Sequence, residues 1–274
     1  MSFHRIRNGI DRLRIKYVRK EFNGWLDHVP DEYMLNFCSF SFGLEYLQLL
    51  DSFLPKKRNQ KLKILIIGVF GGRDYWGLQI QGHKVRGFDI SNIKNIPNIT
   101  YGNAEKKWPF NKASYDVIII GEVLEHLIND SFALNEANRV LNNNGKLIIT
   151  VPYLDDNPIY HIRIHTKKTI ERLLNINNFK IQIYIERPGI FMKDLLNKIL
   201  NTFMLLTIFF LKKSFYKPIS KQLAKLDLFL GKNFFIFRKF LFVLGVKKYG
   251  GFFVCSKSQI SLSYLDKNIK AFSH

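Results

Sequence analysis

Short runs of aliphatic residues, separated by stretches with helical character, constrain the fold of this chain most strongly. The clearest runs are residues 63–67 (KILII), 116–120 (DVIII) and 146–151 (KLIITV), and a further strand is expected at residues 84–89 (KVRGFD). Continuous apolar runs of this length are typical of strands that are buried on both faces of a sheet. Because helices alternate with these strands, the sequence predicts a parallel sheet with helices on both faces.

Weaker signals complete the expected order of elements. Further short strands are expected at residues 99–101, 179–186 and 251–256. Helices are expected at residues 73–81, from a cap at 129–131 to about Leu141, and from a cap at Thr166 to about Leu174. Residues 142–145 (NNNG) should form a turn, with Gly145 near the C-cap of the preceding helix.

The expected fold is α/β: a Rossmann-like, doubly wound, seven-stranded sheet formed by residues 61–187 together with 250–258. Residues 1–60 are expected to form an N-terminal helical extension, and residues 188–249 a helical, basic, Phe-rich insertion before the last strand. The two cysteines lie far apart in the sequence, which excludes a disulfide framework. The first twenty residues are basic without an apolar core segment, so no secretory signal is expected.

The ends of the first two strands carry residues expected at a nucleotide site. Residues 68–72 (GVFGG) follow the first strand, and glycine lets the backbone approach a ligand closely. Asp89 ends the second strand, where its carboxylate can accept hydrogen bonds from both ribose hydroxyls. The alternative for Asp89 is a helix cap or a turn residue. The loop does not fit the dinucleotide fingerprint, which disfavours a nicotinamide-binding oxidoreductase.

Five sequence blocks occur in a specific order. They are KILIIGVFGGRDYWGLQIQGHKVRGFDIS, YGNAEKKWPF, YDVIIIGEVLEHL, RVLNNNGKLIITVP and HIRIHTKKTIERLLNINNFKI. Together they resemble the class I S-adenosylmethionine-dependent methyltransferases, especially the small-molecule type with an EVLEHL segment. The resemblance spans about residues 61–187, with the last strand near 251–257. It implies S-adenosyl-L-methionine as the cofactor and methyl transfer (EC 2.1.1.-) as the activity.

The resemblance also implies roles for individual residues. The cofactor-binding residues would be Gly68, Gly72, Asp89, Ile90, Asn103, Ala104 and Glu122. Asn103 would accept from the adenine amino group, and the backbone N–H of Ala104 would face a ring nitrogen. Glu122 would lie where methyl donor and acceptor meet.

Two residues depart from the family pattern. Ile66 stands where the family usually has an acid, and Phe70 replaces its second glycine. Ile66 cannot make the charge-supported contact near the amino group of the cofactor, and Phe70 would force the loop outward or fill part of the site. Three interpretations stay open: a divergent working site, a changed cofactor pose, or lost activity.

Histidines near the expected strand ends are the acid–base candidates. An oxygen acceptor needs a base, and imidazole is suited to this work near neutral pH. His126 and His161, with Glu122 to orient them, are expected to be catalytic, and His165 is a further candidate. The alternative for each histidine is a structural role in packing or capping. No HxH or HExxH spacing occurs, so no metal site is expected.

Charge and aromatic content indicate an anionic partner. The formal net charge is +20, and residues 190–248 contain twelve Lys/Arg against two acids. Residues 203–211 (FMLLTIFFL) are apolar but too few to span a bilayer, which takes about 20 residues. Two helices, at 203–211 and 228–246, are therefore expected to lie in the plane of an anionic membrane surface. Alternatively, they cover the sheet, cap a substrate pocket or form a dimer seam.

The N-terminal helix could add to this membrane contact. Its apolar residues recur at helical spacing, at positions Ile6, Ile10, Leu13 and Tyr17.

These features together favour a cytoplasmic, peripheral-membrane methyltransferase at the inner face of the membrane. Its partner would be a small-molecule or lipid-linked acceptor, such as a saccharide of surface-polysaccharide biosynthesis, methylated on oxygen. A first alternative is an inactive methyltransferase-like scaffold at the membrane. A second is a nucleic-acid methyltransferase, suggested by the charge but disfavoured because no (N/D)PP(Y/F) segment follows residues 116–120.

Overall fold

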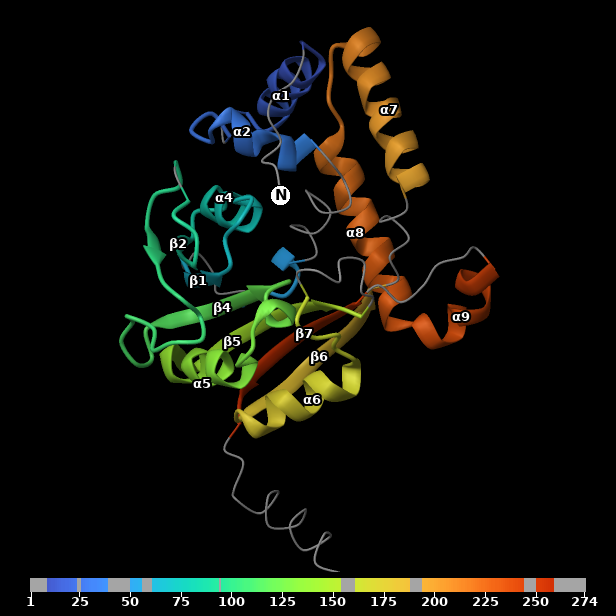
Figure 1. Cartoon of the computed structure of the whole chain (residues 1–274). Coiled ribbons are helices and arrows are strands. Elements are labelled where there is room, and N and C mark those ends of the chain that lie inside the picture. Colours follow the sequence, from blue (N-terminus) through green and yellow to red (C-terminus); the bar gives the residue numbers. More distant parts are fainter. Residues whose placement is uncertain are drawn as a thin grey trace, which may run out of the picture.

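A seven-stranded sheet forms the centre of the computed structural model, with strand order β3-β2-β1-β4-β5-β7-β6 (Figure 1). The structure describes residues 9–23, 26–38, 50–55, 61–93, 95–153, 161–187, 194–243 and 250–258. The strands are β1 Lys63–Ile67, β2 Lys84–Asp89, β3 Ile99–Tyr101, β4 Tyr115–Gly121, β5 Leu141–Pro152, β6 Phe179–Arg187 and β7 Gly250–Lys257. All seven predicted strands are therefore confirmed.

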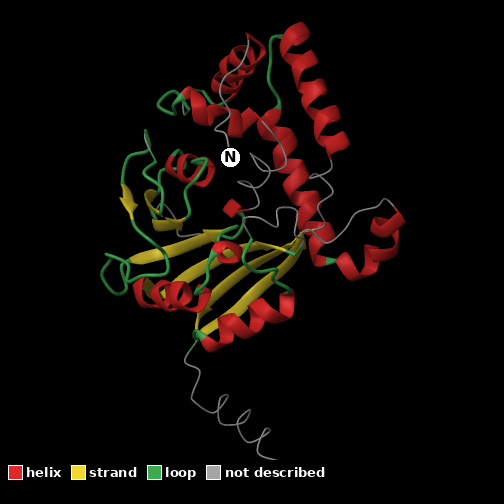
Figure 2. Cartoon of the chain, viewed as in Figure 1, coloured by secondary structure: helices red, strands yellow, loops and turns green. Residues whose placement is uncertain are grey.

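Helices flank this sheet on both sides, as predicted (Figure 2). The longer ones are α1 Gly9–Glu21, α4 Arg73–Gln79, α5 Asp130–Val140, α6 Lys167–Ile176, α7 Asp194–Leu211, α8 Tyr216–Lys232 and α9 Phe234–Val243. Short helical turns occur at α2 Asp31–Met34, η1 Leu35–Cys38 and η3 Leu124–His126. Helix α4 is two residues shorter than predicted. The predicted caps are confirmed, because Asn129 accepts from the N–H of Phe132 and Thr166 accepts from that of Thr169.

The prediction of a wholly parallel sheet is wrong at its last strand. β7 runs antiparallel to both β5 and β6, while β1 to β5 pair in parallel. Gly250, the first residue of β7, pairs with Pro152 and Arg187, the last residues of β5 and β6. The chain thus enters β7 at the edge where β5 and β6 end, and this reverses the strand.

The predicted turn at residues 142–145 is also wrong, because these residues belong to β5. Leu141 is already extended, with φ −70° and ψ 141°. The pairing then shifts from Tyr115 opposite Leu141 to Val117 opposite Lys146, so the extra residues form an irregularity in the strand. A Cβ on Gly145 would lie 2.6 Å from the Leu141 side chain, so close packing explains the glycine.

Alternate strand residues build two separate apolar cores. Ile64 and Ile66 of β1 point into a core that also contains Trp76 of α4 and residues of α1, α7 and α8. Leu65 and Ile67 point into the opposite core, formed with α5 and α6. Because neighbouring residues of a strand face opposite ways, a continuous apolar run serves both layers.

The predicted continuous helix over residues 228–246 is wrong, because the insertion holds three helices. α8 ends at Lys232 and α9 begins at Phe234; the side chain of Asn233 between them donates to the carbonyl of Phe229 at 2.8 Å. α8 packs against β6 so closely that a Cβ on Gly231 would lie 2.3 Å from the Glu186 carbonyl oxygen. Among the described residues, no helix has both the length and the apolar character needed to cross a bilayer.

Helix α1 is docked onto the insertion, beside α7 in Figure 1. The Arg14 guanidinium donates to the Tyr216 hydroxyl at 3.0 Å and to the side-chain oxygen of Asn201 at 3.3 Å. The Glu21 carboxylate accepts from the backbone N–H groups of Tyr216 and Lys217 at the start of α8, at 3.1 and 2.7 Å. The N-terminal helix therefore fixes the helices of the insertion.

Of the apolar residues expected to give α1 a membrane-facing side, Tyr17 is instead buried and Leu13 is half-buried. Ile10 is exposed, and Ile6 lies outside the described residues.

Candidate active site

The carboxyl ends of the parallel strands carry two groups of polar residues. We call the first the Asp89 side: the loop of residues 68–72, Asp89, Ile90 and the loop of residues 102–104. We call the second the Glu125 side: residues 122–126 after β4, residues 161–165, and Arg187. Ligands bind at this edge in open α/β sheets.

Asp89 holds together the backbone of its own side. One carboxylate oxygen accepts from the N–H groups of Val69 and Phe70, at 2.7 and 3.2 Å, and the other accepts from Ser91 at 2.8 Å. A carboxylate offers about four acceptor positions, so these bonds leave about one for a ligand. A ribose hydroxyl would therefore compete with the loop N–H groups for the Asp89 carboxylate. The hydrogen bond from Phe70 is the longest of the three.

The glycine loop is tightly folded against its neighbours. Gly68 and Gly72 have φ values of 74° and 68°, which favour glycine. A Cβ on Gly68 would lie 2.4 Å from the Val123 side chain, so this glycine brings the two sides of the site into contact. Phe70 has a φ of 28° and is 54% exposed, so the loop turns its ring outward. Ile66 is buried in the core below the loop, where it faces no ligand.

Ile90 and the loop after β3 lie next to Asp89. Ile90 is 62% exposed and offers an apolar surface. The N–H of Gly102 donates to the Asp89 carbonyl at 2.8 Å, which fixes the start of the loop. The side-chain oxygen of Asn103 accepts from the N–H of Glu105 at 2.8 Å, and the Ala104 carbonyl accepts from the Trp108 indole at 3.0 Å. Asn103 therefore uses its carbonyl to shape the loop.

On the Glu125 side, Glu122 forms an ion pair that the sequence did not reveal. Its carboxylate lies 3.1 Å from the guanidinium of Arg187, whose side chain is only 5% exposed. Glu122 also has a φ of 53°, which is rare for a residue with a side chain. Arg187 ends β6, 65 residues later in the chain, and its side chain reaches Glu122 across the ends of β5 and β7, which lie between β4 and β6 in the sheet.

Glu125 is the residue of this side that sequence reasoning missed. It is 1% exposed, and its Oε2 atom makes no hydrogen bond to the part of the chain that the structure describes. Burial, with the nearby negative charge of Glu122, raises the pKa of Glu125 to about 8. The EVLEHL segment contains Glu125, but a buried acid cannot be distinguished there from an exposed one by spacing alone.

The two predicted histidines meet beside Glu125. The His126 and His161 rings are 5.0 Å apart between centroids, and His126 Nε2 lies 3.8 Å from Glu125 Oε1. His165 is buried instead, and its Nε2 makes no hydrogen bond within the described ranges. Burial lowers the pKa of His165, which fits a neutral packing residue. The structure thus brings His126 and His161 together, while His165 lies below them.

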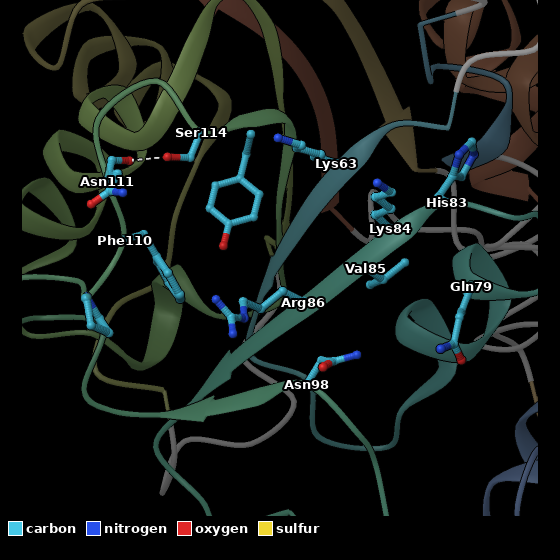
Figure 3. Close-up of a pocket in the computed structure, with 12 residues that line it drawn as sticks. Lys63, Gln79, His83, Lys84, Val85, Arg86, Asn98, Phe110, Asn111 and Ser114 are labelled. Carbon is cyan, nitrogen blue, oxygen red and sulfur yellow. Dashed lines mark hydrogen bonds between the residues drawn. The ribbon is translucent and has the colours of Figure 1, made fainter.

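A cavity of about 520 Å³ lies at the opposite edge of the sheet (Figure 3). Its lining includes Lys63, Lys84 and Tyr115, the first residues of β1, β2 and β4. Because α/β sheets bind ligands at the carboxyl ends of their strands, we do not assign this cavity to the active site.

Comparison with known proteins covers the Asp89 side and residues 122–126 of the Glu125 side. A family profile described as "Methyltransferase domain" matches residues 68–149, from the glycine loop to the end region of β5. Residues 68–149 therefore match the methyltransferase domain family.

The proteins that resemble this chain are similar to it at low sequence identity. An uncharacterised protein of Methanocaldococcus jannaschii is 30% identical over 151 residues, which are 54% of this chain and 62% of that protein. The chain therefore matches less than two thirds of that relative's length. A phosphoethanolamine N-methyltransferase of Haemonchus contortus, solved with phosphomonomethylethanolamine and S-adenosylhomocysteine, has a TM-score of 0.53 at 18% identity, covering 87% of this chain and 60% of that one.

A Pyrococcus horikoshii protein has a TM-score of 0.49 at 15% identity, covering 88% and 98%. At such identities the likeness of the solved structures concerns the fold alone.

The residues of the methyltransferase domain fit the adenosine part of S-adenosylmethionine. Asp89 keeps acceptor capacity for a ribose hydroxyl, and exposed Ile90 offers a face for an adenine ring. At the methionine end, Ile66 is buried in the core and Phe70 stands outward, so neither supplies a polar contact. The two ends of the cofactor would thus be bound unequally.

Proposed function

We propose that this chain is an S-adenosylmethionine-dependent methyltransferase that O-methylates a lipid-linked or membrane-surface small molecule, such as a saccharide, at the cytoplasmic face of a membrane. The observation that carries the proposal is the meeting of Asp89 and of the His126–His161 pair at one edge of the sheet, joined where Val123 contacts Gly68. In this proposal Asp89 would bind the nucleoside, and the histidines at the same edge of the sheet would take a proton.

The chemistry divides between the two sides. The cofactor supplies an electrophilic methyl group, and Asp89, Ile90 and Ala104 would hold its adenosine. His126 or His161 would accept the proton of the acceptor hydroxyl, because both are accessible and close together. Arg187 would keep Glu122 in place, so that its carboxylate orients the acceptor.

Exposed apolar residues on the insertion support the membrane location. On α7, four such residues recur three or four positions apart and so share one face: Ile199, Phe203, Leu206 and Phe210, at 50–72% exposure. Lys212 and Lys213 are exposed at the end of this helix. On α9, Phe235 and Ile236 are 83% and 74% exposed. Apolar groups flanked by lysines suit an anionic lipid surface, where each lysine contributes about 1 kcal/mol.

The glycolipid proposal gains further support from three isoleucines on the Glu125 side. Ile128, Ile162 and Ile164 are 55–68% exposed, although they lie on the segments that carry the histidines. An amphipathic acceptor could cover these side chains, and a free sugar could not.

Calorimetry with S-adenosylmethionine and S-adenosylhomocysteine tests the cofactor, followed by transfer of a labelled methyl group to lipid extracts. We expect both molecules to bind and label to appear in a lipid-linked product. No binding of either at millimolar concentration would refute the proposal.

Sedimentation with vesicles tests the membrane surface. We expect binding to anionic vesicles but not to neutral ones, and loss of binding in the variants F209S/F210S and K212E/K213E. The matched controls are I176S in α6 and K180E in β6, at exposed positions outside the insertion. A concentration-dependent dimer that disappears in F209S/F210S, without vesicle binding, would show instead that α7 joins two copies.

A catalytically inactive scaffold is the second candidate. The buried Ile66 favours it because this side chain offers no polar contact at the methionine end, and the three backbone bonds to Asp89 favour it because they leave about one acceptor position for the ribose. Vesicle binding without cofactor binding would support this candidate, whereas any labelled lipid product would exclude it.

A further inference from the structure

Three side chains on the Glu125 side converge as metal ligands do. One donor atom from each of Glu125, His126 and His161 lies within 4.8 Å of the other two. Their spacing in the sequence matches no common metal motif, since His161 follows His126 by 35 residues. The sequence therefore gave no reason to expect a metal here, and only the fold creates this group.

The buried carboxylate of Glu125 points to a missing partner. Its Oε2 atom is buried and makes no hydrogen bond among the described residues, although buried polar groups are normally hydrogen-bonded. Glu122 adds a second negative charge nearby, and Arg187 is the cation that pairs with Glu122. A cation bound between Glu125 and the histidines would relieve this imbalance.

The backbone holds these ligands in place. The Glu125 carbonyl accepts from the N–H groups of Ile162 and Arg163 at 2.8 and 3.2 Å, which brings His161 to η3. The Arg163 guanidinium in turn donates to Asp130 at 2.9 Å and to the Ile128 carbonyl at 2.6 Å. Four hydrogen bonds therefore position the two segments, so the cluster is not an accident of mobile surface side chains.

We infer that Glu125, His126 and His161 bind a divalent first-row transition-metal ion and leave one or more coordination positions open. Two imidazoles and one carboxylate are a ligand set that zinc and its neighbours accept, whereas magnesium and calcium prefer oxygen alone. Metal–ligand bonds of about 2.0–2.2 Å require donors within roughly 4.3 Å of each other. The donor atoms lie within 4.8 Å of one another, so side-chain shifts of less than about one ångström would bring them within this limit.

The role of the ion depends on the proposed function, but its binding does not. If the chain methylates a hydroxyl, the open position faces the acceptor side, where an ion lowers the pKa of a bound hydroxyl and fixes its orientation. In that case the histidines act as ligands and not as bases.

Cobalt(II) is the probe for this site, because its visible absorption reports the ligand set and geometry. The full-length chain, freed of metals with a chelator and then dialysed, would be titrated with cobalt(II) and then with zinc(II) in competition. We expect one ion per chain, with E125Q and H161N weakening its affinity by about 100-fold or more, since even supporting residues cost 10–100-fold. The matched controls are E171Q and H28N. Glu171 forms an exposed ion pair with Lys167, and His28 is an exposed histidine outside the cluster.

Three results decide the inference. Saturable binding that is lost in E125Q and H161N but kept in both controls supports it. Binding that H28N removes, or that all variants share, overturns it, and so does an absence of binding by the parent chain. Because H161N changes a half-buried loop residue, it remains informative if E125Q fails to fold. Cofactor binding is measured separately, so failure of the metal site and failure of the proposed function are distinguishable.

Discussion

The two sides of the active site use buried carboxylates in opposite ways. Asp89 is surrounded by three backbone donors, and its bonds define the loop that follows β1. Glu125 is buried more deeply, yet one of its oxygens has no hydrogen bond among the described residues. The comparison shows that the Asp89 carboxylate has its hydrogen-bond partners within the chain, whereas the Glu125 carboxylate gains a full set of partners only when a ligand such as a metal ion binds.

The largest effect should come from Asp89. We expect Asp89→Ala to lower the free energy of unfolding by about 3 kcal/mol, because three N–H groups lose a charged acceptor. It should also weaken cofactor binding by about 1–3 kcal/mol through the lost ribose contact. Urea unfolding and calorimetry measure these effects. Asp27→Ala, at an exposed position, is the control, and an Asp89→Ala variant as stable as this control would contradict the described role.

A smaller effect should come from the ion pair across the sheet. We expect Arg187→Met to lower the free energy of unfolding by about 2 kcal/mol, because Glu122 then stays partly buried beside Glu125 without its cation. Arg172→Met replaces an exposed arginine of α6 and should change stability by less than about 0.5 kcal/mol. Equal unfolding curves for the two variants would show that the pair contributes nothing.

The pH dependence of stability should reveal Glu125. Burial, and then Glu122, raise the pKa of this carboxyl to about 8, so between about pH 5 and pH 8 the folded chain holds a proton that the unfolded chain has released. Stability should therefore fall as pH rises, by at most about 1.4 kcal/mol per pH unit. Unfolding of the metal-free chain at several pH values measures this slope.

The slope should be smaller in Glu125→Gln and unchanged in Glu171→Gln. Equal slopes in the parent chain and in Glu125→Gln would contradict the raised pKa of Glu125.

Local signals were sufficient to predict most of the fold. Apolar runs located all seven strands, and the capping side chains of Asn129 and Thr166 located two helix starts. The predictions were wrong where contacts between distant parts of the chain determine the local structure. The direction of β7 depends on where the insertion returns to the sheet, and residues 142–145 were drawn into β5 by pairing with β4.

The location of the candidate site residues was predicted from the sequence, but the interactions between them were not. Asp89, Glu122, His126 and His161 do lie at one edge of the sheet. Their partners could not be predicted. Arg187 reaches Glu122 across two intervening strands, and Ile162 and Arg163 reach Glu125 through backbone hydrogen bonds. The burial of Glu125 is likewise a property of the folded chain.

The bonds from α1 to the start of α8 also set an order of events during synthesis. Glu21 accepts hydrogen bonds from Ser214, Tyr216 and Lys217, which are 193 to 196 residues later in the chain. The ribosome synthesises the first helix long before residues 214–217, so the apolar side of α1 stays exposed until the helices that bury it have been made. A chaperone, or the membrane itself, could occupy that side until the last third of the protein has emerged.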